Sequence, residues 1–180
     1  IYSDAGQFRQ APGVLINDRP IVNSLEIQNG VVVFSGFLHG PNDPMVNPTL
    51  GVTQEYSLLA GKIFLTRMSS AISIGGEHII FINNPIEGDE VGDTARLIGS
   101  MPIGPFENNL SLQVIDPATG VLLHEGFMVQ APDMGAPATF DNEIHIPGVT
   151  SGTELLLVLN ELSMADGSPM AIASVRVIAK

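Results

Sequence analysis

The stretch that decides the fold is residues 106–129, FENNLSLQVIDPATGVLLHEGFMV. Apolar residues alternate with polar or small ones on both sides of a central turn, which is the period-two pattern of half-buried strands. The turn is residues 116–120, DPATG, in which Pro117 presets a turn backbone angle and Gly120 supplies a left-handed exit. The stretch therefore predicts a β-hairpin.

The composition favours short strands joined by many turns. Glycine (19) and proline (13) are so frequent among the 180 residues that few long helices fit between them. The hydrophobic content of 44% is sufficient for a core, and the charged content of 14% excludes a disordered acidic tail or a coiled coil. The absence of cysteine excludes disulfides, thiolate metal sites and cysteine catalysis.

The charge of the chain bears on its partners. Seven basic and nineteen acidic residues give a net charge of −12, which repels nucleic acid and anionic lipid. No apolar run approaches the roughly 20 residues that cross a bilayer. The sequence begins with Ile1, and a removed signal peptide would fit an exported protein.

The first 78 residues carry two kinds of pattern. Residues 1–20 are expected to form an extended leader with one apolar patch, Val14, Leu15 and Ile16. Residues 21–38 then predict a second hairpin, because an Asn-Gly pair at positions 29 and 30 lies between strand-like runs.

The segment from Thr53 to Ser70 is ambiguous between helix and strand. Thr53 is a candidate N-cap, and a helical spacing of apolar residues follows it. Gly61 would weaken a helix, and the residues after it alternate. We expect a short helix over residues 53–60, followed by a strand over residues 62–68.

The rest of the chain reads as strands separated by regular turn signals. Residues 155–159 are apolar on both faces, which suits a central strand covered on each side. Seven strands are expected from the end of the first part onward, the typical number for an immunoglobulin-like antiparallel sandwich. Besides the two arms of the 106–129 hairpin, they are residues 78–82, 94–98, 139–146, 153–160 and 171–179.

Several motifs support a family resemblance. Residues 82–180 resemble the immunoglobulin-like domain of bacterial spore-germination-type secreted proteins. The resemblance rests on five segments of this sequence: residues 84–91 (NPIEGDEV), 104–110 (GPFENNL), the 116–120 turn, the strand containing Phe140, and residues 160–169 (NELSMADGSP).

The resemblance implies an extracytoplasmic accessory domain with no known catalytic apparatus. It covers slightly over half of the chain and leaves residues 1–78 unrecognised. We therefore expect a mainly β chain in two parts: residues 1–78, a leader with a small β-rich module, and residues 79–180, an immunoglobulin-like sandwich.

The sequence offers no catalytic or cofactor-binding motif. No two of the four histidines have metal-ligand spacing, and no Gly-x-Ser-x-Gly motif occurs. His124 and His145 fall on expected strands beside Glu125 and Glu143, so we expect surface cross-strand pairs.

Calcium is the one metal for which candidates exist. Asp89 and Asp93 belong to the acidic run of residues 87–93, and calcium takes six to eight oxygen ligands. The run does not match a calcium-loop pattern, so a solvated turn between strands is the favoured interpretation.

Three functions remain open. The first is a non-catalytic structural or binding module, secreted or at the bacterial cell surface, whose partners are other proteins or copies of itself. The second is a subunit of an extracellular filament or coat, in which residues 1–20 add as a strand to a neighbour's open sheet edge. The third is an accessory domain of a secreted sugar-active enzyme, which only fold analogy supports.

Overall fold

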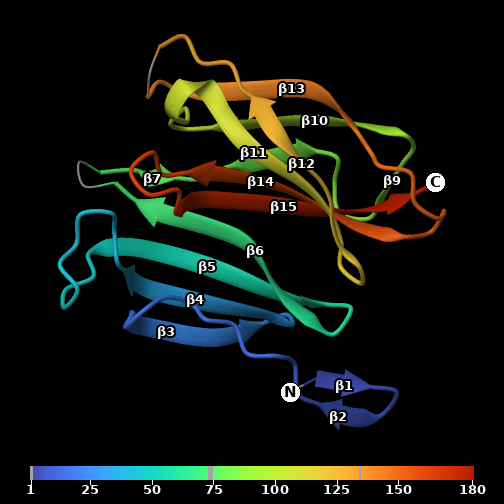
Figure 1. The fold of residues 1–180 in the computed structure, drawn as a ribbon, viewed down its shortest axis with the longest axis horizontal. Coiled ribbons are helices and arrows are strands. Elements are labelled where there is room, and N and C mark those ends of the chain that lie inside the picture. The colour runs from blue at the N-terminus through green and yellow to red at the C-terminus, as the bar shows by residue number, and fades with distance from the viewer. Residues whose placement is uncertain (1, 73–74, 134) are drawn as a thin grey trace.

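A computed structural model describes residues 2–72, 75–133 and 135–180. It is built almost entirely of antiparallel strands, which confirms the expected fold class (Figure 1). The first part of the chain contains β1 (Tyr2–Asp4), β2 (Gln7–Arg9), β3 (Ile21–Gln28), β4 (Val31–Leu38), β5 (Leu50–Leu59), β6 (Lys62–Ala71) and β7 (Glu77–His78). The second contains β8 (Phe81–Asn84), β9 (Asp89–Val91), β10 (Thr94–Met101), the 3₁₀ turn η1 (Phe106–Asn108), β11 (Asn109–Asp116), β12 (Gly120–Met128), β13 (Ala138–His145), β14 (Glu154–Leu162) and β15 (Pro169–Ala179).

The hairpin predicted from residues 106–129 is confirmed as β11 and β12. Leu112 lies opposite Glu125 across the ladder, and a bulge follows Val114. The Asp116 carboxylate accepts hydrogen bonds from the Thr119 hydroxyl (2.7 Å) and the Ala118 N–H (2.8 Å), which close the turn. These bonds, the one from Thr119 first, lower the pKa of Asp116.

Two sheets enclose the core of the second part. The strands β13-β10-β8 form one sheet, and β12-β11-β14-β15 belong to the other. Aliphatic side chains fill the space between them, with an edge-to-face contact of Phe127 and Phe140 at 5.3 Å between ring centroids. Six of the seven expected strands are present, the seventh being divided as described below, and the core rests mainly on aliphatic burial without a disulfide.

The strand β14 is central, as its sequence predicted. Leu155, Leu157 and Leu159 pack into the core between the two sheets. Leu156 and Val158 point to the other face and pack into a second core with residues of β4, β5 and β6. One strand thus contributes to both cores.

The larger sheet crosses the expected boundary between the two parts. Its order is β12-β11-β14-β15-β6-β5-β4-β3, and the junction pairs Met68 of β6 with Ile172 of β15 (Figure 1). Further along β15, the short strand β9 takes the place of β6 as its neighbour, and β9 runs parallel to β15. The division into residues 1–78 and 79–180 stays a prediction.

The helix expected over residues 53–60 is wrong, because the segment lies in strand β5. Val52, Gln54 and Tyr56 alternate inward along β5, the spacing of a half-buried strand. Ala60 and Gly61 both have positive φ, at 47° and 76°, and join β5 to β6 in a tight turn. Gly61, which was interpreted as a helix-weakening residue, is therefore a hairpin residue.

Three other segments differ from the expectation. The strand expected over residues 78–82 is split, since β7 pairs with β6 and β8 pairs with β10 on the other sheet. The acidic run 87–93 is not only a turn, because it includes β9. The leader starts with the hairpin β1–β2, which projects from the rest of the molecule (Figure 1).

The Asn29-Gly30 hairpin is confirmed as β3 and β4, with φ of 51° and 83° at the turn.

Candidate interaction surfaces

The apolar patch of the leader lies against the N-terminal strands. Ile16 is partly buried against the second core, whereas Val14 and Leu15 are 44% and 86% exposed. Together with Asn17 these residues line a groove of about 270 Å³, which we call the leader groove. Its remaining lining is Leu38, His39, Leu50, Gln54, Tyr56, Leu65, Met68, Ser168 and Pro169.

The floor of the leader groove contains a buried polar pair that the sequence did not reveal. The hydroxyl of Tyr56 donates to Oε1 of Gln54 at 2.9 Å, and Nε2 of Gln54 lies 3.5 Å from the Met68 sulfur. Burial raises the pKa of the Tyr56 phenol. These groups satisfy one another, whereas Nε2 of His39, which also lines the groove, is buried without a hydrogen-bond partner among the described residues.

The strand β3 forms one edge of the larger sheet and pairs only with β4. Leu25 lies opposite Phe34 and Ile27 opposite Val32, so both side chains share the face of the second core. Val22, Leu25 and Ile27 are 56%, 60% and 77% exposed. We call the unpaired backbone of β3 and these three side chains the β3 edge.

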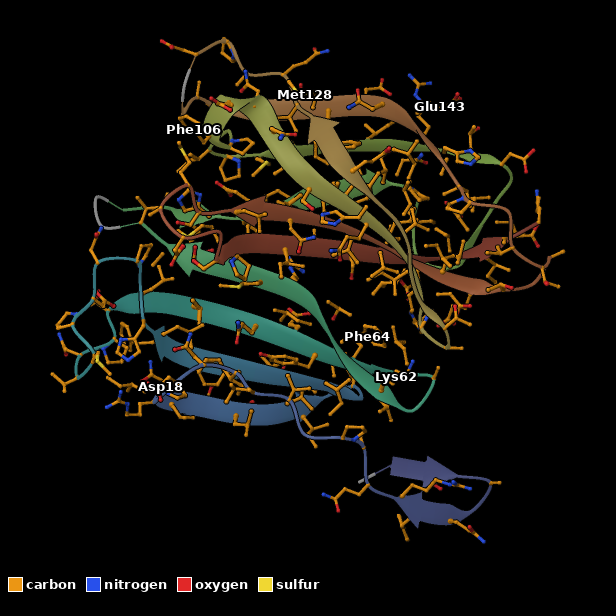
Figure 2. All side chains as sticks on the ribbon, viewed as in Figure 1. Asp18, Lys62, Phe64, Phe106, Met128 and Glu143 are labelled. Carbon is orange, nitrogen blue, oxygen red and sulfur yellow. The ribbon has the colours of Figure 1, made fainter. Side chains whose placement is uncertain are left out.

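A second groove, of about 550 Å³, lies over β11 and β12, and we call it the β12 groove. Phe106 and Glu107 of η1 form one wall, and Leu162 at the end of β14, with Ser163 and Met164 of the loop that follows, forms another. Two segments of the resemblance that are far apart in sequence, residues 104–110 and 160–169, thus meet at one groove. Figure 2 labels Phe106 and Met128 at this end of the sandwich.

The β12 groove also contains a serine–histidine pair. Oγ of Ser111 on β11 lies 2.8 Å from Nε2 of His124 on β12, so His124 forms the expected surface cross-strand pair, and its partner is a serine. His124 makes no other side-chain hydrogen bond with the described residues, so no acid orients it as in a hydrolytic triad. His145 lies opposite Thr94 on β10.

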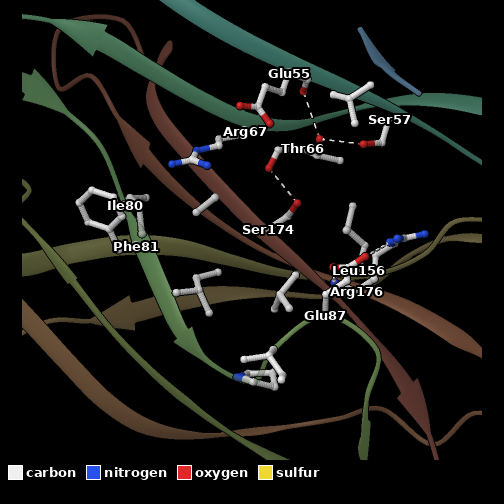
Figure 3. Close-up of a pocket in the computed structure, with 16 residues that line it drawn as sticks. Glu55, Ser57, Thr66, Arg67, Ile80, Phe81, Glu87, Leu156, Ser174 and Arg176 are labelled. Atoms are coloured by element: carbon white, nitrogen blue, oxygen red, sulfur yellow. Dashed lines mark hydrogen bonds and ion pairs between the residues drawn. The ribbon is translucent and has the colours of Figure 1, made fainter. Parts of the chain in front are cut away.

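A third groove, of about 470 Å³, lies where β6 separates from β15 (Figure 3). Ser174 donates to the carbonyl of Thr66 at 2.8 Å, and Arg176 forms an ion pair with Glu87. The first bond holds β15 to β6, and the ion pair holds β15 to the turn before β9, so these polar groups have a structural role.

Of the acidic residues proposed as calcium ligands, Asp89 is the first residue of β9 and Asp93 follows the end of that strand. The Asp89 carboxylate accepts a hydrogen bond from the Ile86 N–H at 2.9 Å, and the backbone carbonyl of Asp93 accepts one from the Ile146 N–H at 2.8 Å. Within the described ranges, no group of three or more His, Asp or Glu side chains is arranged to hold a metal ion. Calcium binding at Asp89 and Asp93 stays a prediction.

A histidine and a buried glutamate form a contact that was not predicted from the sequence. Nδ1 of His78 on β7 lies 2.8 Å from Oε1 of Glu161 on β14, and Glu161 is 4% exposed. Eighty-three positions separate the two residues, and only the folded arrangement of β7 and β14 brings them together. No local pattern could have predicted the contact.

These features define an immunoglobulin-like sandwich with an extended sheet and grooves on its surface. A family model for the immunoglobulin-like domain of bacterial spore germination matches residues 79–168, half of the chain, and the chain belongs to that family. The expected resemblance is thereby confirmed. Such domains are typically non-catalytic binding or structural modules. No curated protein and no solved structure shows a significant match.

Among the described residues, no helix is long and apolar enough to span a bilayer.

Proposed function

We propose that the protein is a non-catalytic structural or binding module, secreted or at the bacterial cell surface, that engages another protein through the β3 edge. The family supports the module class and the compartment. The observation that carries the binding role is the β3 edge itself: β3 pairs with β4 on one side, its other side is open, and it carries three largely exposed apolar side chains.

An unpaired strand edge presents free backbone donors and acceptors to an added strand. Proteins that avoid such pairing guard their edges with lysine, proline or bulges. Inside β3 the only charged residue is Glu26, and a single bulge follows Val22. The apolar side chains would lie beside a partner strand and extend the second core.

The experiment compares native complexes of the wild-type chain and a variant carrying Leu25→Lys and Ile27→Lys. We expect the wild type to sediment from its source bacterium as a complex heavier than its own denatured chain. The variant should sediment as the monomer, because lysine blocks strand addition. Val121→Lys, at an exposed site on the opposite edge of the sheet, is the matched control and should leave the complex intact. A monomeric wild type, or a variant complex of unchanged size, would contradict the proposal.

A second candidate is self-assembly into a filament or coat through the leader. Val14, Leu15 and Ile16 line a groove of their own chain, and the same residues could occupy the leader groove of a neighbour. The β1–β2 hairpin at the start of the leader projects from the rest of the molecule, and its Phe8 is 84% exposed (Figure 1).

Electron microscopy of the native material tests this second candidate. Ordered assemblies should appear, and deletion of residues 1–20 should abolish them. A monomer whose mass does not change with concentration would rule out self-assembly.

A further inference from the structure

We propose that the β12 groove binds a lysine or arginine side chain on an exposed segment of a partner protein. The inference rests on the proposed function, because it specifies the partner chemistry of a binding module. It concerns a different surface from the β3 edge.

The groove has an exposed apolar wall. Phe106, Leu162 and Met164 are 41%, 46% and 64% exposed and line the groove together. The aliphatic stem of lysine or arginine packs on such a surface while its charged end stays in contact with water. The face of an aromatic ring such as Phe106 also attracts a cation.

The groove carries negative charge that no cationic side chain of the described residues pairs with. Glu107 and Glu125 both line it, and neither side chain forms a hydrogen bond or ion pair with a described residue. Arg96 and Arg176 do not neutralise these two carboxylates, because they form ion pairs with Asp141 and Glu87. A cationic side chain from another protein complements the two free carboxylates.

The first wall is held in place by its backbone. Glu107 and Asn108 adopt left-handed conformations, with φ of 53° and 55°. The Asn108 N–H donates to the Pro105 carbonyl at 3.1 Å, and its carbonyl accepts from the Val129 N–H at 2.9 Å. Two successive non-glycine residues in this region are unusual, and such conformations cluster at ligand sites.

The second wall is a closed loop between β14 and β15. The Ser163 N–H donates to the Ser168 carbonyl at 2.8 Å, and the Gly167 N–H donates to the Ser163 carbonyl at 2.8 Å. Because both walls are fixed before a ligand arrives, binding loses little entropy in ordering them.

The test is an NMR titration of the full ¹⁵N-labelled chain with the peptide acetyl-Gly-Arg-Ser-Arg-Gly-amide. We expect shift changes concentrated at Ser111, His124 and Gly126, and weaker binding at higher salt. Glu107→Gln with Glu125→Gln should weaken binding by at least about fivefold, because two charge-assisted contacts are removed. A peptide with glutamine in place of arginine should bind no better than that variant.

The control is the pair Glu26→Gln and Glu143→Gln, which removes the same charge elsewhere. Glu26 lies on β3, and Glu143 lies well apart from Phe106 (Figure 2). This control should bind the arginine peptide like the wild type. Equal weakening by both double variants, shift changes spread over the whole acidic surface, or no binding would overturn the inference.

The β3 variant separates this inference from the proposed function. The chain with Leu25→Lys and Ile27→Lys should bind the peptide as the wild type does, because its groove is unchanged. Absence of peptide binding, with native complexes that still depend on β3, would overturn the groove inference alone.

Discussion

Glu161 is one of only a few polar or charged side chains that the described part of the chain buries. Its oxygen Oε1 contacts His78 at 2.8 Å, whereas Oε2 has no hydrogen-bond partner. A buried carboxylate without full pairing is unfavourable, yet removing one partner of such a pair is usually worse. Glu161 therefore connects β14 to β7, and the connection costs the desolvation of a carboxylate oxygen that has no partner.

We predict that Glu161→Ala lowers the free energy of unfolding by about 3 kcal/mol, because it leaves His78 without its partner and opens a cavity. Urea denaturation measures the change. Glu154→Ala, on the same strand but 50% exposed at its side chain, is the control and should change stability by less than about 0.5 kcal/mol. Similar losses for both variants would contradict a special role for Glu161.

Asp43 gives the protein an acid-sensitive loop. Its carboxylate accepts a hydrogen bond from the Thr49 hydroxyl at 2.6 Å, and others from the N–H groups of Gly40 and Thr49. These bonds, that of the hydroxyl first, hold the pKa of Asp43 below its usual value of 3.8. Because the folded-state pKa is depressed, the stabilisation is complete above 3.8 and is lost as pH falls through the lowered pKa.

We predict that Asp43→Asn makes the melting temperature less dependent on pH below this value. Melting curves of the variant and the wild type, measured from neutral to acid pH, should converge as the pH falls. Glu143→Gln, which removes an exposed carboxylate that makes no hydrogen bond with described residues, should leave the pH dependence unchanged. A constant difference between Asp43→Asn and the wild type at every pH would refute the explanation.

At the scale of single elements, Gly99 allows β8 and β13 to pack on the two sides of β10. A Cβ at this position would lie 2.0 Å from the Phe81 carbonyl oxygen and 2.3 Å from the Phe140 ring. We predict that Gly99→Ala lowers the free energy of unfolding by about 3 kcal/mol, because backbone and ring must both shift. At Gly92 a Cβ would meet nothing within 4 Å, so Gly92→Ala should be close to neutral in the same denaturation experiment. Equal stability of Gly99→Ala and Gly92→Ala would contradict the prediction, because it would show that the strands around β10 accommodate the added methyl group.

Elements were predictable from sequence wherever a turn signal stood beside an alternating run. Asn29-Gly30 and the 116–120 turn both gave the correct hairpin, because their residues favour the required backbone angles. The helix over residues 53–60 failed, because Thr53 and the following spacing suit either structure and tertiary pairing decided for the strand. The switch of sheets between β7 and β8 has no local signal.

At the scale of the whole molecule, the two cores share strand β14, and one sheet crosses the expected domain boundary. We therefore predict a single cooperative unfolding transition. NMR peak intensities of Leu157 in the first core and Met68 in the second should decline with the same urea midpoint. Two separate midpoints would show that residues 1–78 and 79–180 unfold independently.

The candidate sites were only partly predictable from the sequence, because tertiary structure brings distant residues together. The apolar leader patch was visible in the sequence as Val14, Leu15 and Ile16, because the three residues are contiguous. The walls of the β12 groove come from η1 and the loop after β14, and only the fold brings them together. The exposure of β3 followed from its place at the end of the sheet, which no local pattern specifies.

The most direct test of the account is photo-cross-linking from the β3 edge in intact cells of the source bacterium. A photoreactive residue replaces Ile27 in one chain and Glu143 in another, both at exposed sites. The account predicts a discrete protein adduct from position 27, accessible to protease added outside the cells, and none from position 143. No adduct from position 27, or the same adduct from both positions, would contradict it.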